Sequence, residues 1–547
     1  MDLLDRGGWK SWSPLFFSVV LIAGMILGFN LRDSLRNKRD IKSVVTRNDR
    51  LEQIIDLINE KYVDSVKSDV LYNDAVNGIL KSLDPHTVYI PADNLAEENE
   101  ELEGGFSGIG VEFLIVRDTI NVLAVVDNGP AANAGIKVGD QLIRVGDSTI
   151  AGVNITTTRI THMLKGKQRT KVELTVKHFD SQEPEKLTLV RDMIPIHPVE
   201  VSLMLDDVTG YIKLNKFSAT AHKEVVIALG KLKNKGAKQL ILDIRDNPGG
   251  YLGEAKAIVD EFLDDNKLIV FTEGLHAGRT DYTAGTRGMF EKGRVAILVD
   301  ESSASASEIV AGAIQDWDRG IILGRRTFGK GLVQEPYDMT DGSELRLTIA
   351  RYYTPSGRCI QRAFDKGRSA YMQDYEKRFS DEDLYVKDGF SNPDTTRFFT
   401  AGKRIVYGGG GIKPDVFIPH DTLVMARYVQ DKMLGPDLKN VAWAYFLAHY
   451  KTLKYRDADD FRNYFRGEDE ILKNFINTLN TGDRRLVQRE LYKHNVRTYF
   501  LAYIKAQIGR FLYRNEGFYT VTLHQDNMVN EGRKILSSPR YLKIVGR

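Results

Sequence analysis

The sequence of 547 residues contains a single cysteine, Cys359. One cysteine cannot form an intramolecular disulfide framework or a zinc cluster built from cysteines, so both are excluded. An excess of charge of either sign is also missing, because 76 Lys and Arg side chains nearly cancel 74 Asp and Glu side chains. The resulting net charge of +2 gives no global electrostatic reason to expect binding to nucleic acid.

Long apolar runs are nearly absent as well, and the one exception spans residues 14–29 (PLFFSVVLIAGMILGF). The hydrophobic share of 42% and the charged share of 27% are ordinary for globular proteins, which excludes a disordered, collagenous or polytopic membrane chain. The run lies between a signal-peptide core and a spanning helix of about 20 residues in length. No small-residue cleavage site ends it, so we expect an uncleaved signal anchor within residues 1–31.

The length of 547 residues suggests roughly three to four units in all. Residues 40–100 show the apolar spacing of amphipathic helices, and the acidic stretch at 96–103 is interpreted as a solvated helix face without a metal site. Residues 105–192 change to short strands separated by turns. Residues 421–547 have helical patterns and a net charge of +8, which leaves −6 for the rest. We interpret them as a basic helical domain.

Three buried strands are predicted at 239–244, 294–299 and 321–324, and helical patterns follow the first two. Continuous apolar strands that alternate with helices indicate a mainly parallel sheet covered on both faces. In such sheets the loops after the carboxyl ends of the strands meet at one edge, where ligands bind. The catalytic domain is expected over 195–420, with a polar insertion at 363–404.

These three loops carry complementary chemistry. A serine at the start of a helix exposes its hydroxyl, and the following N–H can stabilise an oxyanion. The Gly249-Gly250 pair can supply a second N–H, and Lys330 can act as a general base where burial lowers its pKa. Gln334 can hold the amine without adding charge. The residues alone leave the choice of nucleophile open among Ser302, Ser303, Ser305 and Ser307.

The strand-rich region resembles a PDZ domain of bacterial proteases. The resemblance rests on the string GPAANAGIKVGD at 129–140 and on Ser107 to Val111, which match the helix and the carboxylate-binding loop. Turns permitted by glycine aim successive N–H groups at a peptide carboxylate, while the next strand pairs with the peptide. The expected peptide-binding residues are Gly108, Ile109, Gly110 and Val111.

The motifs LDIRDNPGG, SASASEIVAGAIQD, GRRTFGKGLVQ, ARYYTPSGR and GGGGIKPDV follow in this order behind the PDZ-like region. Over about 45–418 the chain resembles the carboxyl-terminal processing (tail-specific) peptidases. The resemblance implies an α/β multidomain protein with a crotonase-like β/α catalytic domain. It further implies Ser305 as nucleophile, Lys330 as general base, Gln334 as the residue that orients the lysine, and oxyanion donors from the backbone of Ala306, Gly249 and Gly250. No metal or cofactor is expected.

The expected activity is that of a serine endopeptidase that captures unstructured, apolar C-terminal tails through its PDZ domain. Its expected partners are protein or peptide substrates, an adaptor protein, and a second copy bound through the N- and C-terminal helices; nucleic acid is not expected. The chain is expected in a bacterial inner membrane with its catalytic body in the periplasm. The basic residues after the apolar run, four against two before it, oppose that orientation by the positive-inside rule.

Three other functions have some support in the sequence. Residues 324–331 (GRRTFGKG) nearly match a phosphate-binding loop, but Gly331 replaces the magnesium-binding hydroxyl and no helix is predicted to follow. A Ser-His-Asp hydrolase is disfavoured because His197, His222 and His276 lie in no catalytic signature. The third rival is a membrane-anchored PDZ scaffold with an inactive hydrolase-like domain, which the presence of Ser305, Lys330 and Gln334 opposes.

Overall fold

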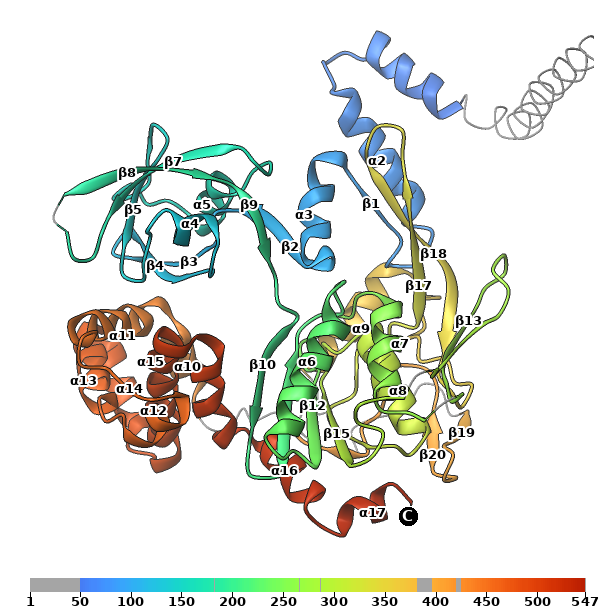
Figure 1. Cartoon of the computed structure of the whole chain (residues 1–547). Coiled ribbons are helices and arrows are strands. Elements are labelled where there is room, and N and C mark those ends of the chain that lie inside the picture. Colours follow the sequence, from blue (N-terminus) through green and yellow to red (C-terminus); the bar gives the residue numbers. More distant parts are fainter. Residues whose placement is uncertain are drawn as a thin grey trace, which may run out of the picture. The chain divides into compact units, whose positions relative to one another are not determined.

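The computed structural model of the chain describes residues 50–181, 183–264, 266–285, 287–380, 396–419 and 425–546 (Figure 1). The chain divides into two compact units, Met1–Leu83 and Asp84–Arg547. The first contains helical residues 50–61 and the helix α2 (Ser68–Leu80). The expected anchor at 14–29 lies outside the described residues, and among the described ones no helix has the length and apolar character needed to cross a membrane.

A six-stranded sheet forms the centre of the second unit, in the order β10-β11-β12-β15-β16-β21. All neighbouring pairs are parallel except β10 and β11, as the continuous apolar strands predicted. The six strands are β10 (Val199–Met204), β11 (Thr209–Leu214), β12 (Gln239–Asp243), β15 (Arg294–Val299), β16 (Ile321–Gly324) and β21 (Val416–Phe417).

One face of this sheet is covered by the three helices α6 (Ala221–Asn234), α7 (Leu252–Asp260) and α8 (Ala306–Asp316) (Figure 1). Their apolar side chains and those of the strands form a single buried cluster. Each of α7 and α8 follows a strand within a few residues, so the start of each helix lies at the carboxyl edge of the sheet. This placement brings the predicted loops to one edge.

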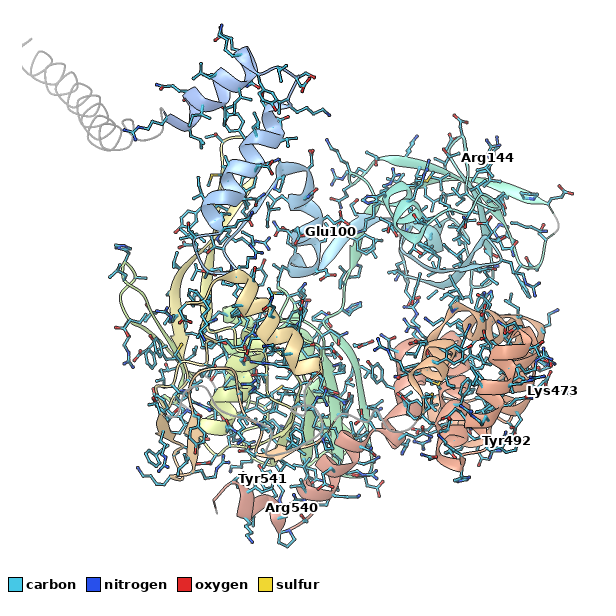
Figure 2. All side chains as sticks on the ribbon, turned by 180° about the vertical axis from the view of Figure 1, so that it is seen from behind. Glu100, Arg144, Lys473, Tyr492, Arg540 and Tyr541 are labelled. Atoms are coloured by element: carbon cyan, nitrogen blue, oxygen red, sulfur yellow. The ribbon has the colours of Figure 1, made fainter. Side chains whose placement is uncertain are left out.

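The opposite face is covered by the end of the chain, α16 (Asn527–Leu536) and α17 (Arg540–Ile544). Figure 2 shows Tyr541 on this segment, and its hydroxyl donates to the carbonyl of Arg319 at 3.1 Å. Arg245 also forms an ion pair with Asp526, with 2.8 Å between Nη2 and Oδ2. The last residues of the expected helical region 421–547 therefore complete the core of the central sheet.

The rest of that C-terminal segment is a helical bundle with its own buried cluster. Aromatic side chains dominate this cluster, among them Trp443, Phe446, Phe461 and Phe500, each no more than 1% exposed. The bundle consists of α10 (Arg427–Leu434), α11 (Pro436–His449), α12 (Ala458–Tyr464), α13 (Glu468–Thr478), α14 (Thr481–Leu491) and α15 (His494–Thr522).

The PDZ-like region forms a separate sheet, ordered β3-β4-β5-β7-β8, around its own core. Of the strands in the described part of the chain, only β4 pairs with β3 (Val111–Val116), which is therefore an edge strand of this sheet. The other elements are β4 (Thr119–Val125), α4 (Pro130–Asn133), β5 (Gln141–Val145), β6 (Ser148–Thr149), α5 (Thr157–Leu164), β7 (Lys171–Lys177) and β8 (Pro184–Val190). A two-stranded sheet of β2 (Gly105–Gly108) and β9 (Asp192–Pro195) lies at the two ends of the region.

A further sheet contributes to the site through its longest strand, β18 (Glu344–Tyr353). Its other strands are β1 (Val88–Ile90), β13 (Leu268–Glu273), β14 (Thr280–Thr283) and β17 (Leu332–Asp338). The insertion at 363–404 contains α9 (Arg368–Ser380) and β19 (Arg397–Phe399). The strand β20 (Ile405–Tyr407), which pairs with β19, begins directly after the insertion.

Candidate active site

A cavity of about 520 Å³ lies at the carboxyl edge of the central sheet. The structure brings all six residues of the expected catalytic set to its wall: Ser305, Ala306, Lys330, Gln334, Gly249 and Gly250. They come from the segments that follow β12, β15 and β16, with Ala306 at the start of α8 and Gln334 on β17, so the loops after these strands converge. Ser302, Ser303 and Ser307 are not among the lining residues, so of the four candidate serines the cavity contains only Ser305.

Ser305 precedes α8 and has an unusual backbone, with φ of 55° and ψ of −114°. A positive φ is costly for a residue with a side chain, and such strain is held in place only by surrounding structure. The turn places the serine at the N-terminus of the helix, where the helix dipole favours negative charge. The geometry therefore suits a nucleophilic hydroxyl, because the negative charge that forms during its attack would lie near the N-terminus of the helix.

The glycine pair approaches this turn more closely than any other residue type permits. A Cβ on Gly249 would lie 2.8 Å from the Cβ of Ser305, and one on Gly250 would lie 2.3 Å from the carbonyl oxygen of Phe217. Both glycines also have a positive φ, of 104° and 145°. Side chains at these two positions would push the turn away from the serine.

The N–H of Gly249 is already engaged, because it donates to Oδ1 of Asn247 at 2.9 Å. One of the three expected oxyanion donors therefore already has an acceptor within its own turn. Among the described residues no acceptor is found for the N–H of Gly250 or of Ala306, and both residues line the cavity. These two N–H groups can receive a developing negative charge.

Lys330 lies in a largely buried position on the loop after β16. Burial lowers the pKa of its ammonium below the usual 10.5, against the charges of Asp84 and Glu308, which raise it. Its Nζ donates to Oε1 of Gln334 at 2.8 Å. The amide of Gln334 in turn donates to the carbonyl oxygen of His86. These two hydrogen bonds fix the orientation of the Lys330 and Gln334 side chains.

Glu308 was not singled out by the sequence reasoning, although it connects two of the loops. Its carboxylate is fully buried and accepts hydrogen bonds from the N–H groups of Ser305, Gly329 and Lys330 at 2.8–2.9 Å. Burial raises its pKa to about 7, although these hydrogen bonds and that from Thr327 act in the opposite direction. An acidic residue three positions after a helix-capping serine is a known signature and would have identified it.

Two more residues of the site were also missed. The Tyr352 hydroxyl lies 3.0 Å from the carbonyl oxygen of Ser305 and 2.7 Å from that of Lys330. The ring of His86 contacts Tyr371 at 2.9 Å, and burial together with the charge of Lys330 lowers the pKa of His86 to about 4. Both contacts join segments far apart in the chain, and no local pattern marked them.

The expected peptide-binding residues lie at the start of the edge strand β3. Gly110 has a φ of 75°, and a Cβ there would lie 3.1 Å from Ile194 and 3.2 Å from Val126. Ile109 is 2% exposed and belongs to the core of the PDZ-like region. The free edge of β3 is suited to pairing with an added peptide strand.

The phosphate-loop rival fails, because the residues after Gly331 form the strand β17 and no helix begins there. Two of the three histidines of the second rival have other partners: His197 contacts Glu224 and His222 contacts Glu261, each at 2.8 Å. Neither histidine lines the cavity with Ser305.

Comparisons with known protein families agree with this arrangement. Residues 208–365 match Peptidase family S41, residues 107–189 match the PDZ domain, and residues 29–94 match the Activating protease CtpB N-terminal domain. Residues 438–514 match a family of unknown function, DUF8443.

The Carboxy-terminal processing protease CtpA of Bacillus subtilis is 30% identical over 77% of this chain and 91% of its own. The Carboxy-terminal-processing protease of Bartonella bacilliformis is 33% identical over 57% of this chain and 72% of its own. Among solved structures, a photosystem II D1 C-terminal processing protease matches 68% of this chain and 87% of its own, with 25% identity and a TM-score of 0.35. The inactive-scaffold alternative has no support among these relatives. The chain belongs to the carboxy-terminal processing proteases, serine-type peptidases of family S41 that carry a PDZ domain.

Proposed function

We propose that Ser305 is the nucleophile and Lys330 the general base of a serine endopeptidase. The observation that carries this proposal is their position in one cavity, together with a burial that lowers the pKa of Lys330. A neutral amine is required of a base, and burial favours the neutral form. Gln334 holds the amine by an uncharged hydrogen bond, so it does not raise the pKa as a carboxylate would.

In the proposed reaction, Oγ of Ser305 attacks the carbonyl carbon of the scissile peptide bond while its proton moves to Nζ of Lys330. The carbonyl oxygen becomes an oxyanion and accepts from the N–H groups of Gly250 and Ala306. The C–N bond then breaks, and the leaving amine takes the proton from Lys330. Water attacks the resulting ester in the same way, which releases the acid and restores the serine.

We further propose that the PDZ domain binds the C-terminal tail of the substrate. The tail would pair with the free edge of β3, and its carboxylate would accept from N–H groups of the loop at Gly108 to Val111. A charge-assisted hydrogen bond contributes about 1.5–3 kcal/mol, so amidation of the tail removes a substantial part of the affinity. Apolar terminal side chains would lie against α5.

A matched pair of glycine substitutions tests this tail capture. Gly110 and Gly146 both have a positive φ within the PDZ domain, but only Gly110 has side-chain neighbours within 4 Å of an added Cβ. We expect Gly110→Ala to raise KM for an unstructured substrate with an apolar C-terminus by about tenfold, given the hydrogen bonds at stake. Gly146→Ala should leave KM unchanged. Equal KM values for the free-acid and amidated substrates would contradict tail recognition.

We also propose that the chain is anchored in a bacterial inner membrane through residues 14–29, that its body is periplasmic, and that its N- and C-terminal helices pair two copies. An adaptor protein would deliver substrates.

Support for the pairing of two copies comes from exposed apolar side chains at a spacing of three residues on the N-terminal helix: Leu51, Ile54 and Leu57 are 39%, 54% and 57% exposed.

Ile54→Glu should lower the mass of the full chain measured by sedimentation in detergent, since a charge would have to be buried in the interface. The exposed Asp56→Lys on the same helix is the control. A dimer that persists in Ile54→Glu would contradict pairing through this helix. Cleavage of the substrate by the purified chain alone would contradict the need for an adaptor protein.

A further inference from the structure

The serine-rich loop before α8 contains polar groups that the proposed reaction does not use. Asp300 is 4% exposed and Ser303 is fully buried, although both lie within five residues of the nucleophile. Buried polar side chains need hydrogen-bond partners, and these two have theirs both within their own loop and on the neighbouring loop. These hydrogen-bond partners indicate which segments Asp300 and Ser303 hold together.

Asp300 accepts from the N–H of Asp246 at 3.0 Å and from the N–H groups of Ser302 and Ser303 at 3.1 Å. Ser303 accepts from the N–H of Asp300 at 3.0 Å and donates to the carbonyl of Ile244 at 2.8 Å. The pair therefore joins the nucleophile loop to the loop that carries the glycine turn. We call Asp300, Ser303 and the main-chain groups of Ile244 and Asp246 the clasp.

The clasp acts on the first residues of the glycine turn. Asp246 has a φ of 58°, an unfavourable conformation for a residue with a side chain, and its N–H is bound by Asp300. The next residue, Asn247, accepts the N–H of Gly249 and receives the hydroxyl of Ser307 on its carbonyl oxygen. A shift of Asp246 would therefore move the turn that presents Gly250.

We propose that Asp300 and Ser303 are positioning residues that hold the oxyanion-binding turn against the nucleophile, and that the protonation state of Asp300 controls this hold. The proposal rests on the proposed function of Ser305 and Gly250. It requires that Asp300 exchange protons with solvent, and that its protonation weaken the clasp.

A second cavity satisfies the first requirement. It has a volume of about 440 Å³, contains Asp246 and Asp300 in its wall, and shares no lining residue with the cavity of Ser305. Burial and the charge of Asp246 raise the pKa of Asp300 to about 6, although the N–H of Asp246 and the charge of Arg325 oppose the shift. The other charged or titratable groups that face Asp300 or line this cavity are Glu301, Tyr375, Lys213, Asp243, Arg245, Tyr499, Tyr519 and Asp526.

All three N–H groups donate to Oδ1 of Asp300. Protonation of the carboxylate at Oδ2 weakens the clasp, because each of these hydrogen bonds then loses the charge of its acceptor, and a hydrogen bond to a charged group is roughly twice as strong as a neutral one. Since the pKa lies near 6, Asp300 is ionised and the clasp closed above this pH, and the clasp loosens below it. The loss should appear in kcat rather than in KM, because the oxyanion exists only in the transition state.

The test compares pH profiles of kcat and KM for the full chain, using a peptide substrate with a free apolar C-terminus. We expect the wild type to show a downward break in log kcat near pH 6, added to the slope due to Lys330. Asp300→Asn should lack that break and should lower kcat at neutral pH by about 10- to 100-fold, the cost of a misplaced oxyanion donor. Ser303→Ala should lower kcat similarly and keep the break.

Asp415→Asn is the matched control, because Asp415 is also buried and accepts a main-chain N–H, from Ile322 at 2.8 Å. It should lower the unfolding temperature without changing the pH profile. Two results would overturn the proposed role of the clasp: a break near pH 6 that persists in Asp300→Asn, or a kcat of Asp300→Asn that falls no further than the kcat of Asp415→Asn. Cleavage that survives Ser305→Ala would instead overturn the proposed function, so the two failures are distinguishable.

Discussion

Replacing Ser305 by alanine should abolish cleavage of an unstructured, apolar-tailed substrate while leaving binding of that substrate intact. Without Oγ no acyl-enzyme can form, and loss of a serine nucleophile costs about 10⁶-fold in kcat in a comparable peptidase. The measurement is single-turnover cleavage at saturating enzyme, with tail binding followed separately by fluorescence anisotropy. Because the PDZ domain has its own core, binding should be unaffected.

The variant supplies its own control for folding. Apart from the loss of the capping hydroxyl, which costs about 1 kcal/mol, the expected effect is confined to chemistry, so the thermal unfolding transition of Ser305→Ala should lie only a few degrees below that of the wild type. Turnover above about 1% of the wild-type rate would contradict the assignment, because the other effects of a correctly formed site account for only about 10³–10⁴ over water. A variant that neither cleaves nor binds would indicate that the tail contacts the catalytic loop directly.

The predicted strands and loops were right because the information for them is local. The strand at 239–244 is β12, which ends at Asp243, and the strand at 321–324 is β16 with the same bounds. Short apolar runs between turns specify buried parallel strands, and the topology rule then places their loops at one edge. The convergence of Gly250, Ser305 and Lys330 follows from these two facts.

What the sequence did not reveal depends on contacts between distant segments. The covering of the sheet by α16 could not be predicted, because its apolar face would fit the helical bundle equally well. The choice between Gly249 and Gly250 depends on where the side chain of Asn247 points, which no spacing encodes. The partner of Gln334 is a carbonyl 248 residues away.

Glu308 illustrates a third kind of gap. Its position after Ser305 was visible as a capping signature, but a capping glutamate is usually exposed and pairs only with its own helix. Here the side chain is buried, and it accepts from Thr327, Gly329 and Lys330 on another loop. The same residue therefore stabilises the turn at Ser305 and positions the loop of the base.

Lys330→Arg should be as inactive as Lys330→Ala, which is the second large effect we expect. A guanidinium stays protonated at all accessible pH values, so it keeps the positive charge but cannot accept the proton of Ser305. Without its general base the serine is no longer activated as a nucleophile, and such a loss costs about 10⁴–10⁶-fold in kcat. The control is Lys256→Arg on α7, where the lysine forms a surface ion pair with Asp260 and where charge alone suffices.

The pH profile tests the same assignment without a mutation. The active form of Lys330 is neutral, so kcat/KM should rise with pH and level off above the pKa of Lys330. Because burial lowers that pKa, the plateau should begin below the usual lysine value of 10.5. Glu308 acts in the opposite direction, since its ionisation favours the charged amine, so Glu308→Gln should move the plateau to lower pH. A rate that still rises at pH 10.5, or an active Lys330→Arg, would contradict a buried lysine base.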